Sequence, residues 1–136
     1  MATLGAYLTI DGAAEAIEFY KAAFGAEEVM RMPSDDHPGR LLHAEIKVFD
    51  TALMMSDTFP EFGPTKSPKA LGGTTFNLIV GLDAPAAVDA AMAKAEKAGA
   101  TISMPAADMF WGQRFGALFD PFGHMWAFTA DLPKQG

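Results

Sequence analysis

The chain has 136 residues, half of them hydrophobic, and its formal net charge at pH 7 is −7. This length suits one domain with a sizeable core, and the acidic balance argues against nucleic-acid binding. Cysteine is absent, so disulfides and thiolate metal sites are excluded. Neither a signal-peptide pattern nor an apolar stretch of membrane-spanning length occurs, so we expect a cytoplasmic protein that does not enter a membrane.

The first half of the chain alternates strand and helix patterns. Residues 5–10 predict a strand, and apolar residues at helical spacing predict a helix over 13–24. Asp11 or Gly12 is expected to cap this helix, and Gly25 stands where a left-handed terminator is needed. Three further strands are predicted in EEVMRM, LLHAEIKV and ALMMS.

The second half repeats this order. Residues 76–82 predict a strand, and Asp83 is expected to cap a helix that has Pro85 in its first turn and Gly99 at its end. The remaining strands are TISM, QRFGALF and HMWAFTA, with the turn DPFG between the last two.

The two halves also match residue by residue at a constant offset of 74 positions. The matched pairs are Gly25 and Gly99, Met30 and Met104, Arg40 and Arg114, and Asp57 and Asp131. We therefore predict one α+β domain over 1–136, with a first βαβββ module over about 1–57, an exposed loop over 58–74 and a second module over about 75–132. The two modules should form a curved mixed-sheet trough with the helices on its outer face, a natural place for a small molecule.

Three segments carry a resemblance to a known family: AIEFYKAAFGAE, AMAKAEKAGATI and FDPFGHMWAF. They resemble the glyoxalase/bleomycin-resistance/dioxygenase superfamily, also called the vicinal oxygen chelate fold. Two longer segments, HAEIKVFDTALMMSD and DMFWGQRFGALFDPFGHMW, are similar to the PhnB-like branch of that superfamily. The resemblance covers nearly the whole chain. It implies the tandem fold, a small-molecule ligand in the trough and a homodimer. A methyltransferase activity is not supported, because the chain has no Gly-rich nucleotide loop.

The resemblance also implies a divalent metal held by four strand positions, usually His, Gln or Glu. Carried onto this sequence, those positions fall on Gly5, Met54, Asn77 and Ala127. A hard divalent cation needs carboxylates, imidazoles or several waters held by the protein. One amide oxygen does not supply such a site, so we expect no metal and no other cofactor.

Alternation along the strands predicts which side chains face the trough. If Ala127 faces it, Trp126 faces the helix and belongs to the core. Tyr7 shares the face of Gly5, and with Met54 and Asn77 it is a candidate substrate-binding residue.

In LLHAEIKV, the apolar set Leu42, Ala44, Ile46 and Val48 should pack on the helix, so His43 and Glu45 point into the trough. A carboxylate beside an imidazole suits general acid or base chemistry, and the pair could also ligate a displaced metal. A solvated or dimer-facing polar pair is the third interpretation, and the sequence leaves all three open.

The aromatic stretch FWGQRFGALFDPFGHMWAF adds two candidate substrate-binding residues. Trp111 could cover a ligand or simply lie on the core. Arg114 could bind an anionic ligand, such as a phosphate ester, or form a surface ion pair with Asp108 or Asp120. His124 follows the turn DPFG on the face opposite to Ala127, and we interpret it as structural.

Three functions remain open. The first is a metal-independent small-molecule binding protein, for which the acidic surface could attract a cationic ligand. The alternative is an enzyme of the lyase, isomerase or dioxygenase type with a relocated site at His43 and Glu45. The third is a scaffold whose trough is filled by its own side chains.

Overall fold

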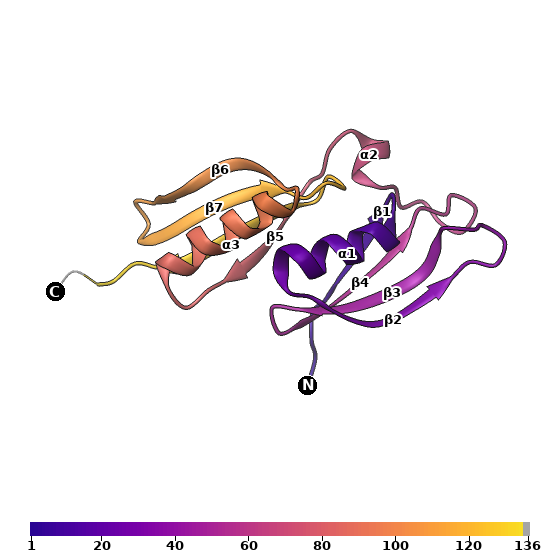
Figure 1. Cartoon of the computed structure of the whole chain (residues 1–136), viewed down its shortest axis with the longest axis horizontal. Coiled ribbons are helices and arrows are strands. Elements are labelled where there is room, and N and C mark those ends of the chain that lie inside the picture. The colour runs from indigo at the N-terminus through magenta and orange to yellow at the C-terminus, as the bar shows by residue number, and fades with distance from the viewer. Residues whose placement is uncertain (135–136) are drawn as a thin grey trace.

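The computed structural model describes residues 1–134 and contains two four-stranded mixed sheets (Figure 1). The first module consists of β1 (Ala6–Ile10), α1 (Ala13–Phe24), β2 (Glu27–Pro33), β3 (Leu41–Val48) and β4 (Thr51–Asp57), with strand order β1-β4-β3-β2. The second consists of β5 (Asn77–Gly81), α3 (Pro85–Ala98), β6 (Thr101–Asp108), β7 (Gln113–Phe119) and β8 (Met125–Asp131), with order β5-β8-β7-β6.

Both sheets have the same pairing pattern. The first strand of each module runs parallel to the last, and the other neighbours are antiparallel. The predicted α+β fold with tandem βαβββ modules is therefore confirmed. No helix in the described part of the chain is long and apolar enough to cross a membrane.

The segment between the modules contains an unpredicted short helix, α2 (Pro68–Leu71). The Ser67 hydroxyl accepts a hydrogen bond from the Ala70 N–H at 3.3 Å, and Pro68 occupies the first turn, where its missing N–H costs nothing. Pro68 and Ser67 are buried, so this part of the segment packs on the protein rather than forming an open loop.

The cap of α1 comes from a distant residue. Gly12 is the N-cap, with φ 100°, and has no side chain that could accept a hydrogen bond. Instead the Asp57 carboxylate, at the end of β4, accepts the N–H groups of Gly12 at 2.9 Å and Ala13 at 3.1 Å. The same carboxylate accepts the Leu41 N–H at 2.7 Å. Asp57 thus ties the start of the helix to two strands. At the other end Gly25 is left-handed, as predicted.

The expected cap of α3 is not present. The N-cap is Ala84, in an extended conformation without a side-chain hydrogen bond, and Asp83 lies one residue outside the helix. Pro85 does occupy the first turn, and Gly99 ends the helix as predicted. No side chain caps this helix start, but the fixed φ of Pro85 is already close to the helical value and favours it.

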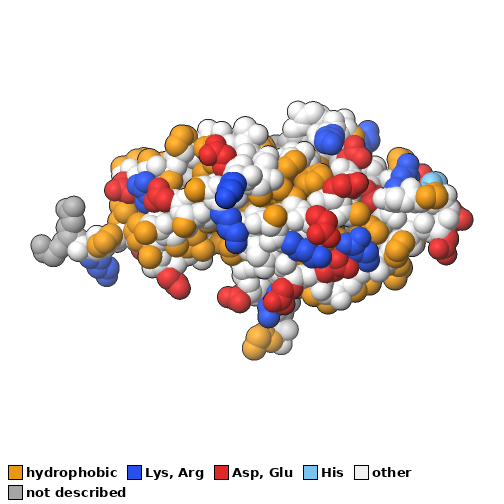
Figure 2. All heavy atoms as spheres, in the orientation of Figure 1, with side chains coloured by type: hydrophobic (Ala, Val, Ile, Leu, Met, Phe, Trp, Pro, Cys, Tyr) orange, Lys and Arg blue, Asp and Glu red, His pale blue; other side chains and the backbone are white. Residues whose placement is uncertain are grey.

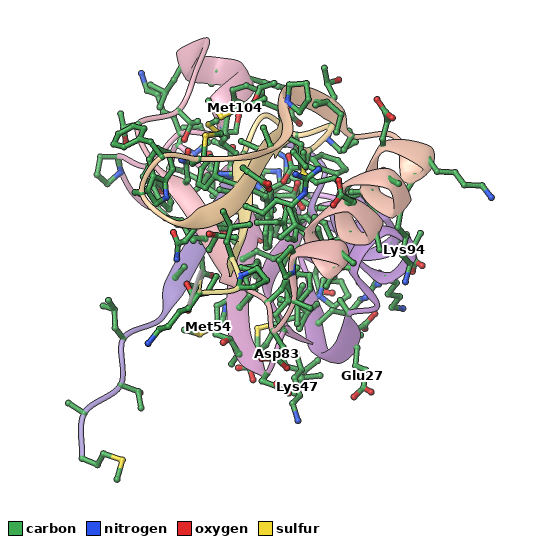
Figure 3. All side chains as sticks on the ribbon, turned by 90° about the vertical axis from the view of Figure 1, so that its left-hand side faces the viewer. Glu27, Lys47, Met54, Asp83, Lys94 and Met104 are labelled. Carbon is green, nitrogen blue, oxygen red and sulfur yellow. The ribbon has the colours of Figure 1, made fainter. Side chains whose placement is uncertain are left out.

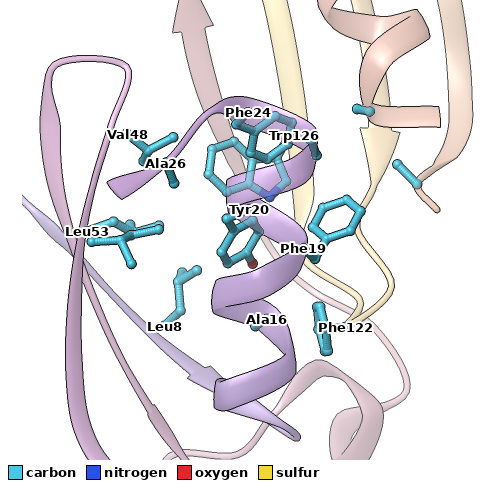
Figure 4. Close-up of a cluster of buried hydrophobic side chains, with 14 of the residues drawn as sticks. Leu8, Ala16, Phe19, Tyr20, Phe24, Ala26, Val48, Leu53, Phe122 and Trp126 are labelled. Atoms are coloured by element: carbon cyan, nitrogen blue, oxygen red, sulfur yellow. The ribbon is translucent and has the colours of Figure 1, made fainter. Parts of the chain in front are cut away.

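Helix α1 lies against both modules (Figure 4). Leu8 and Leu53 of the first sheet pack on one side of it, and Trp126 of β8 lies on another. The Phe24 and Trp126 rings are 4.6 Å apart, and the Tyr20 and Trp126 rings 5.5 Å. Trp126 is only 2% exposed, so its assignment to the core is confirmed.

A buried carboxylate joins α1 to the turn before β8. Asp120 accepts a hydrogen bond from the Tyr20 hydroxyl at 2.6 Å and from the Trp126 indole N–H at 3.0 Å. Its other oxygen accepts the backbone N–H groups of Phe122 and His124. Burial and the neighbouring Asp120 carboxylate raise the pKa of Tyr20 well above its ordinary value. Four donors compensate the burial of this charge.

His124 has a structural contact, as predicted. Its ring is buried, and Nε2 lies 3.1 Å from the carbonyl oxygen of Thr9. Since a carbonyl can only accept, Nε2 carries the hydrogen and donates it. The contact links β1 of the first module to the DPFG turn of the second.

Helix α1 packs on one face of the first sheet and α3 on one face of the second, and we call the opposite face of each sheet its open face. Figure 3 shows Met54 and Met104 on the side of the sheets away from α3 and its Lys94. On the helix side, acidic and basic side chains lie interleaved over the surface (Figure 2). The helices and sheets thus position the open faces for contact with a ligand or a partner.

Candidate functional site

Four of the predicted site residues lie on the open face of the first sheet. Tyr7 pairs with Met54 in register, and Met54 pairs with Glu45, so the three form a row across β1, β4 and β3. The intervening residues Leu8 and Met55 are buried toward α1, which turns the row away from the helix. His43 lies two positions before Glu45 on the same face.

Tyr7 and His43 contact each other directly. The Tyr7 hydroxyl lies 2.9 Å from His43 Nδ1, and the two rings are stacked with centroids 5.5 Å apart. Because β4 separates their strands, the tyrosine side chain must cross it to reach the imidazole. This contact orients the ring of His43 and leaves its Nε2 atom for another partner. Tyr7 itself remains 49% exposed, so its ring is accessible.

Alternation fails at one end of β3. Leu41 is buried and Leu42 is 37% exposed, contrary to the prediction that Leu42 packs on the helix. Met32 pairs with His43, but Pro33 pairs with Leu41, so Leu42 is an extra residue in β3 at this point. Such a bulge changes which side chains face the helix. From Ala44 onward the predicted alternation holds.

A cavity of about 590 Å³, which we call the junction cavity, is lined by residues of both modules. Gly5 and Asn77 line it, together with apolar side chains that include Leu53, Phe76 and Trp126. Asn77, at the start of β5, is exposed and lines this cavity. It is not part of the row of Tyr7, Met54 and Glu45.

Trp111 lies at the turn between β6 and β7 and is half exposed. Its indole N–H donates to the Gln113 side chain at 3.1 Å, and Gln113 donates in turn to Asp131 at 3.0 Å. Phe110 and Phe115 contact its ring edge-on. It belongs to an aromatic cluster of the second module and does not line the junction cavity.

Arg114 is engaged elsewhere. Its guanidinium forms a two-pronged contact with Asp89 of α3, at 2.7 and 2.8 Å, and pairs with Asp108 at 2.8 Å. The Asp108 ion pair is one of the predicted alternatives and is confirmed, whereas the Asp89 contact was not predicted. These carboxylates raise the pKa of Arg114, and the guanidinium lowers that of Asp89. Since Asp89 lies on α3, Arg114 points to the helix side, so it does not join the open-face residues.

The four positions expected to hold a metal do not fit one. Gly5, Met54, Asn77 and Ala127 provide one amide oxygen and no imidazole or carboxylate. Across residues 1–134, no group of three or more His, Cys, Asp or Glu side chains could hold a metal ion. The side chains at these positions are thus unsuited to a hard divalent cation.

Comparison with known proteins identifies the family of this chain. A model of the Glyoxalase/Bleomycin resistance protein/Dioxygenase superfamily matches residues 5–128, so the chain belongs to this superfamily. The protein Rv0887c of Mycobacterium tuberculosis (strain H37Rv) is 40% identical over 128 residues, covering 91% of this chain and 71% of the relative. Mb0911c of Mycobacterium bovis has the same identity and is covered to 80%.

Solved structures show the same fold. PA1353 of Pseudomonas aeruginosa has a TM-score of 0.77 at 24% identity, with 98% of this chain and 100% of that chain covered. The PhnB protein of Bacillus cereus has a TM-score of 0.72 at 24% identity, with 95% and 99% covered. TioX from Micromonospora sp. ML1 has a TM-score of 0.68 at 25% identity, with 99% and 100% covered.

Proposed function

We propose that this PhnB-like protein binds a small organic molecule on the open face of the first sheet, without a divalent metal. The observation that carries the proposal is the row of Tyr7, Met54 and Glu45, with His43 beside it, at a place where the expected metal ligands are missing. The exposed Tyr7 ring also argues against a trough filled by its own side chains. Asn77 at the junction cavity would extend the same binding surface.

The first experiment combines metal analysis with a ligand screen. We expect no stoichiometric metal in protein purified without a His-tag and no large stabilisation by Mn, Fe, Co, Ni or Zn. Neutral, cationic and anionic aromatic compounds are then screened by thermal shift, and at least one should raise the melting temperature saturably. A bound stoichiometric metal would contradict the metal-free part of the proposal.

A matched pair of variants tests the location. Met54→Lys puts a charge in the middle of the row and should abolish the shift caused by the screened compound. Ala93→Lys adds the same charge on the exposed side of α3 and should leave the shift unchanged. If no compound of the panel raises the melting temperature, or if Met54→Lys binds as well as the unaltered protein, binding at this face is overturned.

A second candidate function is acid–base catalysis by His43 and Glu45. The Tyr7 hydrogen bond to His43 Nδ1 favours it, because it orients the imidazole while leaving Nε2 free to exchange a proton. If a bound compound is converted, His43→Ala and Glu45→Gln should fold normally and lose the conversion. Variants that keep the full rate would exclude this role.

We also propose that the protein is a homodimer whose interface covers part of the open faces. Met32, at the far edge of the first sheet, is 48% exposed, and Ile79 and Met104 on the second sheet are 64% and 43% exposed. Apolar side chains gathered on an uncovered sheet face are typical of an interface. Sedimentation should give a dimer for the unaltered chain and for Ala93→Lys, and a monomer for Ile79→Lys. A monomeric unaltered chain would refute the proposed dimer.

The expected cytoplasmic location is a separate proposal, and cell fractionation would test it.

A further inference from the structure

The Glu45 side chain lies between two methionines of the neighbouring strands, with His43 and Lys47 two residues away on the same face. Its partners in register are Met54 on β4 and Met30 on β2, and its side chain is half-buried. Within residues 1–134, no Lys, Arg or His forms an ion pair with it. A carboxylate in such surroundings gives up part of its hydration without a compensating cation from the chain.

Some other carboxylates of this protein have cations close by. Glu28 pairs with Arg31, and Asp89 and Asp108 pair with Arg114. Lys47 shares the strand and face of Glu45 but is exposed and forms no ion pair with it. Glu45 is therefore placed to be the counter-ion of a charge that comes from outside the chain.

The rest of the row suits an apolar body attached to that charge. Tyr7 and Glu45 lie two strands apart, which is about 10 Å, with Met54 between them. Methionine adapts its shape to different apolar ligands, and the half-exposed Tyr7 ring offers an aromatic face to the apolar body. Beyond Tyr7, a hollow of about 470 Å³ is lined by Pro64, Lys66, Leu71 and Phe76 among others, which leaves room for a larger ligand.

We infer that the ligand class is an organic cation, a protonated or quaternary amine carried on an aromatic or branched apolar body. The Glu45 carboxylate faces the positive charge, and Met30, Met54 and the Tyr7 ring contact the body. This inference rests on the proposed binding function and adds the charge and shape of the ligand to it.

The test uses three probes of nearly equal shape and different charge. They are benzyltrimethylammonium, its neutral isostere neopentylbenzene, and the anion phenylmethanesulfonate. The readout is the NMR shift of methionine methyl groups labelled with ¹³C, assigned by single Met→Leu variants. We expect the cation to shift the Met30 and Met54 methyls saturably and to bind about tenfold more tightly than the neutral probe, because Coulomb attraction between the ammonium and the half-buried carboxylate adds to the apolar contact.

Two charge-neutralising variants make the test specific. Glu45→Gln keeps the shape of the side chain and should remove the preference for the cation. Glu96→Gln removes one exposed charge from α3 and should leave the preference intact, which separates local from overall electrostatics. The methyl spectrum of each unliganded variant verifies its folding.

The outcomes separate the inference from the proposed function. Equal affinity for the cation and the neutral probe at the same methyl groups would overturn the inference and support binding at the open face. Unchanged cation affinity in Glu45→Gln would also overturn it. If the cation leaves the Met30 and Met54 methyls unmoved, the inference is wrong, while the proposed function is decided by the thermal-shift panel.

Discussion

The Tyr7 hydroxyl lies 2.9 Å from Nδ1 of His43, although 36 residues separate them in the chain. The contact spans three neighbouring strands, because β4 lies between β1 and β3. It joins two residues that the sequence singled out separately into one tyrosine–imidazole pair on an accessible face. The orientation of the His43 ring is therefore set in part by Tyr7.

Removing the hydroxyl should release the imidazole. In Tyr7→Phe we expect a changed ratio of the two neutral His43 tautomers, because one ring nitrogen loses its partner. Long-range ¹H–¹⁵N spectra measure the ratio, and His124, bonded to the Thr9 carbonyl, serves as the internal reference. Stability should fall by about 1 kcal/mol or less, since the pair is partly exposed. An unaltered His43 tautomer ratio would contradict this assignment.

Two aspartates at equivalent positions of the repeat should differ strongly in their effect on stability. Asp57→Ala leaves the N–H groups of Gly12, Ala13 and Leu41 without an acceptor, and we expect a loss of about 3 kcal/mol in unfolding free energy. Asp131 is exposed and is bonded only to the Gln113 side chain among the described residues, so Asp131→Ala should cost about 0.5 kcal/mol or less. Urea unfolding measures both, and equal losses would refute the capping role of Asp57.

Tyr20 should make stability depend on pH in the alkaline range. The folded chain holds the Tyr20 proton more tightly than the unfolded chain, whose tyrosine titrates near 10. Unfolding therefore becomes easier as pH rises above about 10, by about 1.4 kcal/mol at pH 11 from this group.

The Tyr20→Phe variant isolates this contribution. It should cost about 1–3 kcal/mol at neutral pH, because Asp120 loses a donor. The stability advantage of the unaltered protein over this variant should then shrink between pH 10 and 11. Urea unfolding at several pH values measures it, and a difference independent of pH would contradict a raised Tyr20 pKa in the folded state.

A side chain at Gly123 would clash with a neighbouring residue, whereas a side chain at Gly39 would not. Both have φ near +90°, so an alanine at either position is strained by about 1 kcal/mol. At Gly123 an added Cβ would lie 2.7 Å from Cβ of Pro68, whereas nothing lies within 4 Å at Gly39. We expect Gly123→Ala to cost about 2 kcal/mol more than Gly39→Ala by thermal or urea unfolding. Similar losses of unfolding free energy would show that Pro68 moves away from the added methyl group at little cost.

Arg114 should prove unimportant for ligand binding. Because Asp89 and Asp108 already engage its guanidinium, Arg114→Gln should leave the affinity for a screened ligand unchanged. The same change should raise the pKa of Asp89 toward its ordinary value, which ¹³C titration of the carboxyl group can follow. Arg31→Gln, in the other module, should leave the Asp89 titration unaltered. A clear loss of ligand affinity in Arg114→Gln would restore Arg114 as a binding residue.

The sequence by itself determined the architecture and the faces of most strands. Helical and alternating apolar patterns depend on residues close together in the chain, and they occur twice, 74 residues apart. The order of the elements and the core position of Trp126 could therefore be predicted from residue spacing.

Only the tertiary structure decided which side chains meet. The cap of α1 comes from Asp57, the partner of Arg114 is Asp89, and His43 is joined to Tyr7. Each of these contacts depends on how strands and helices pack, which local periodicity does not encode. The exposure of Leu42 has the same origin, because a shift in strand pairing overrides alternation. The unpaired charge of Glu45 also emerged only in three dimensions, since pairing is decided by which neighbours the fold brings near.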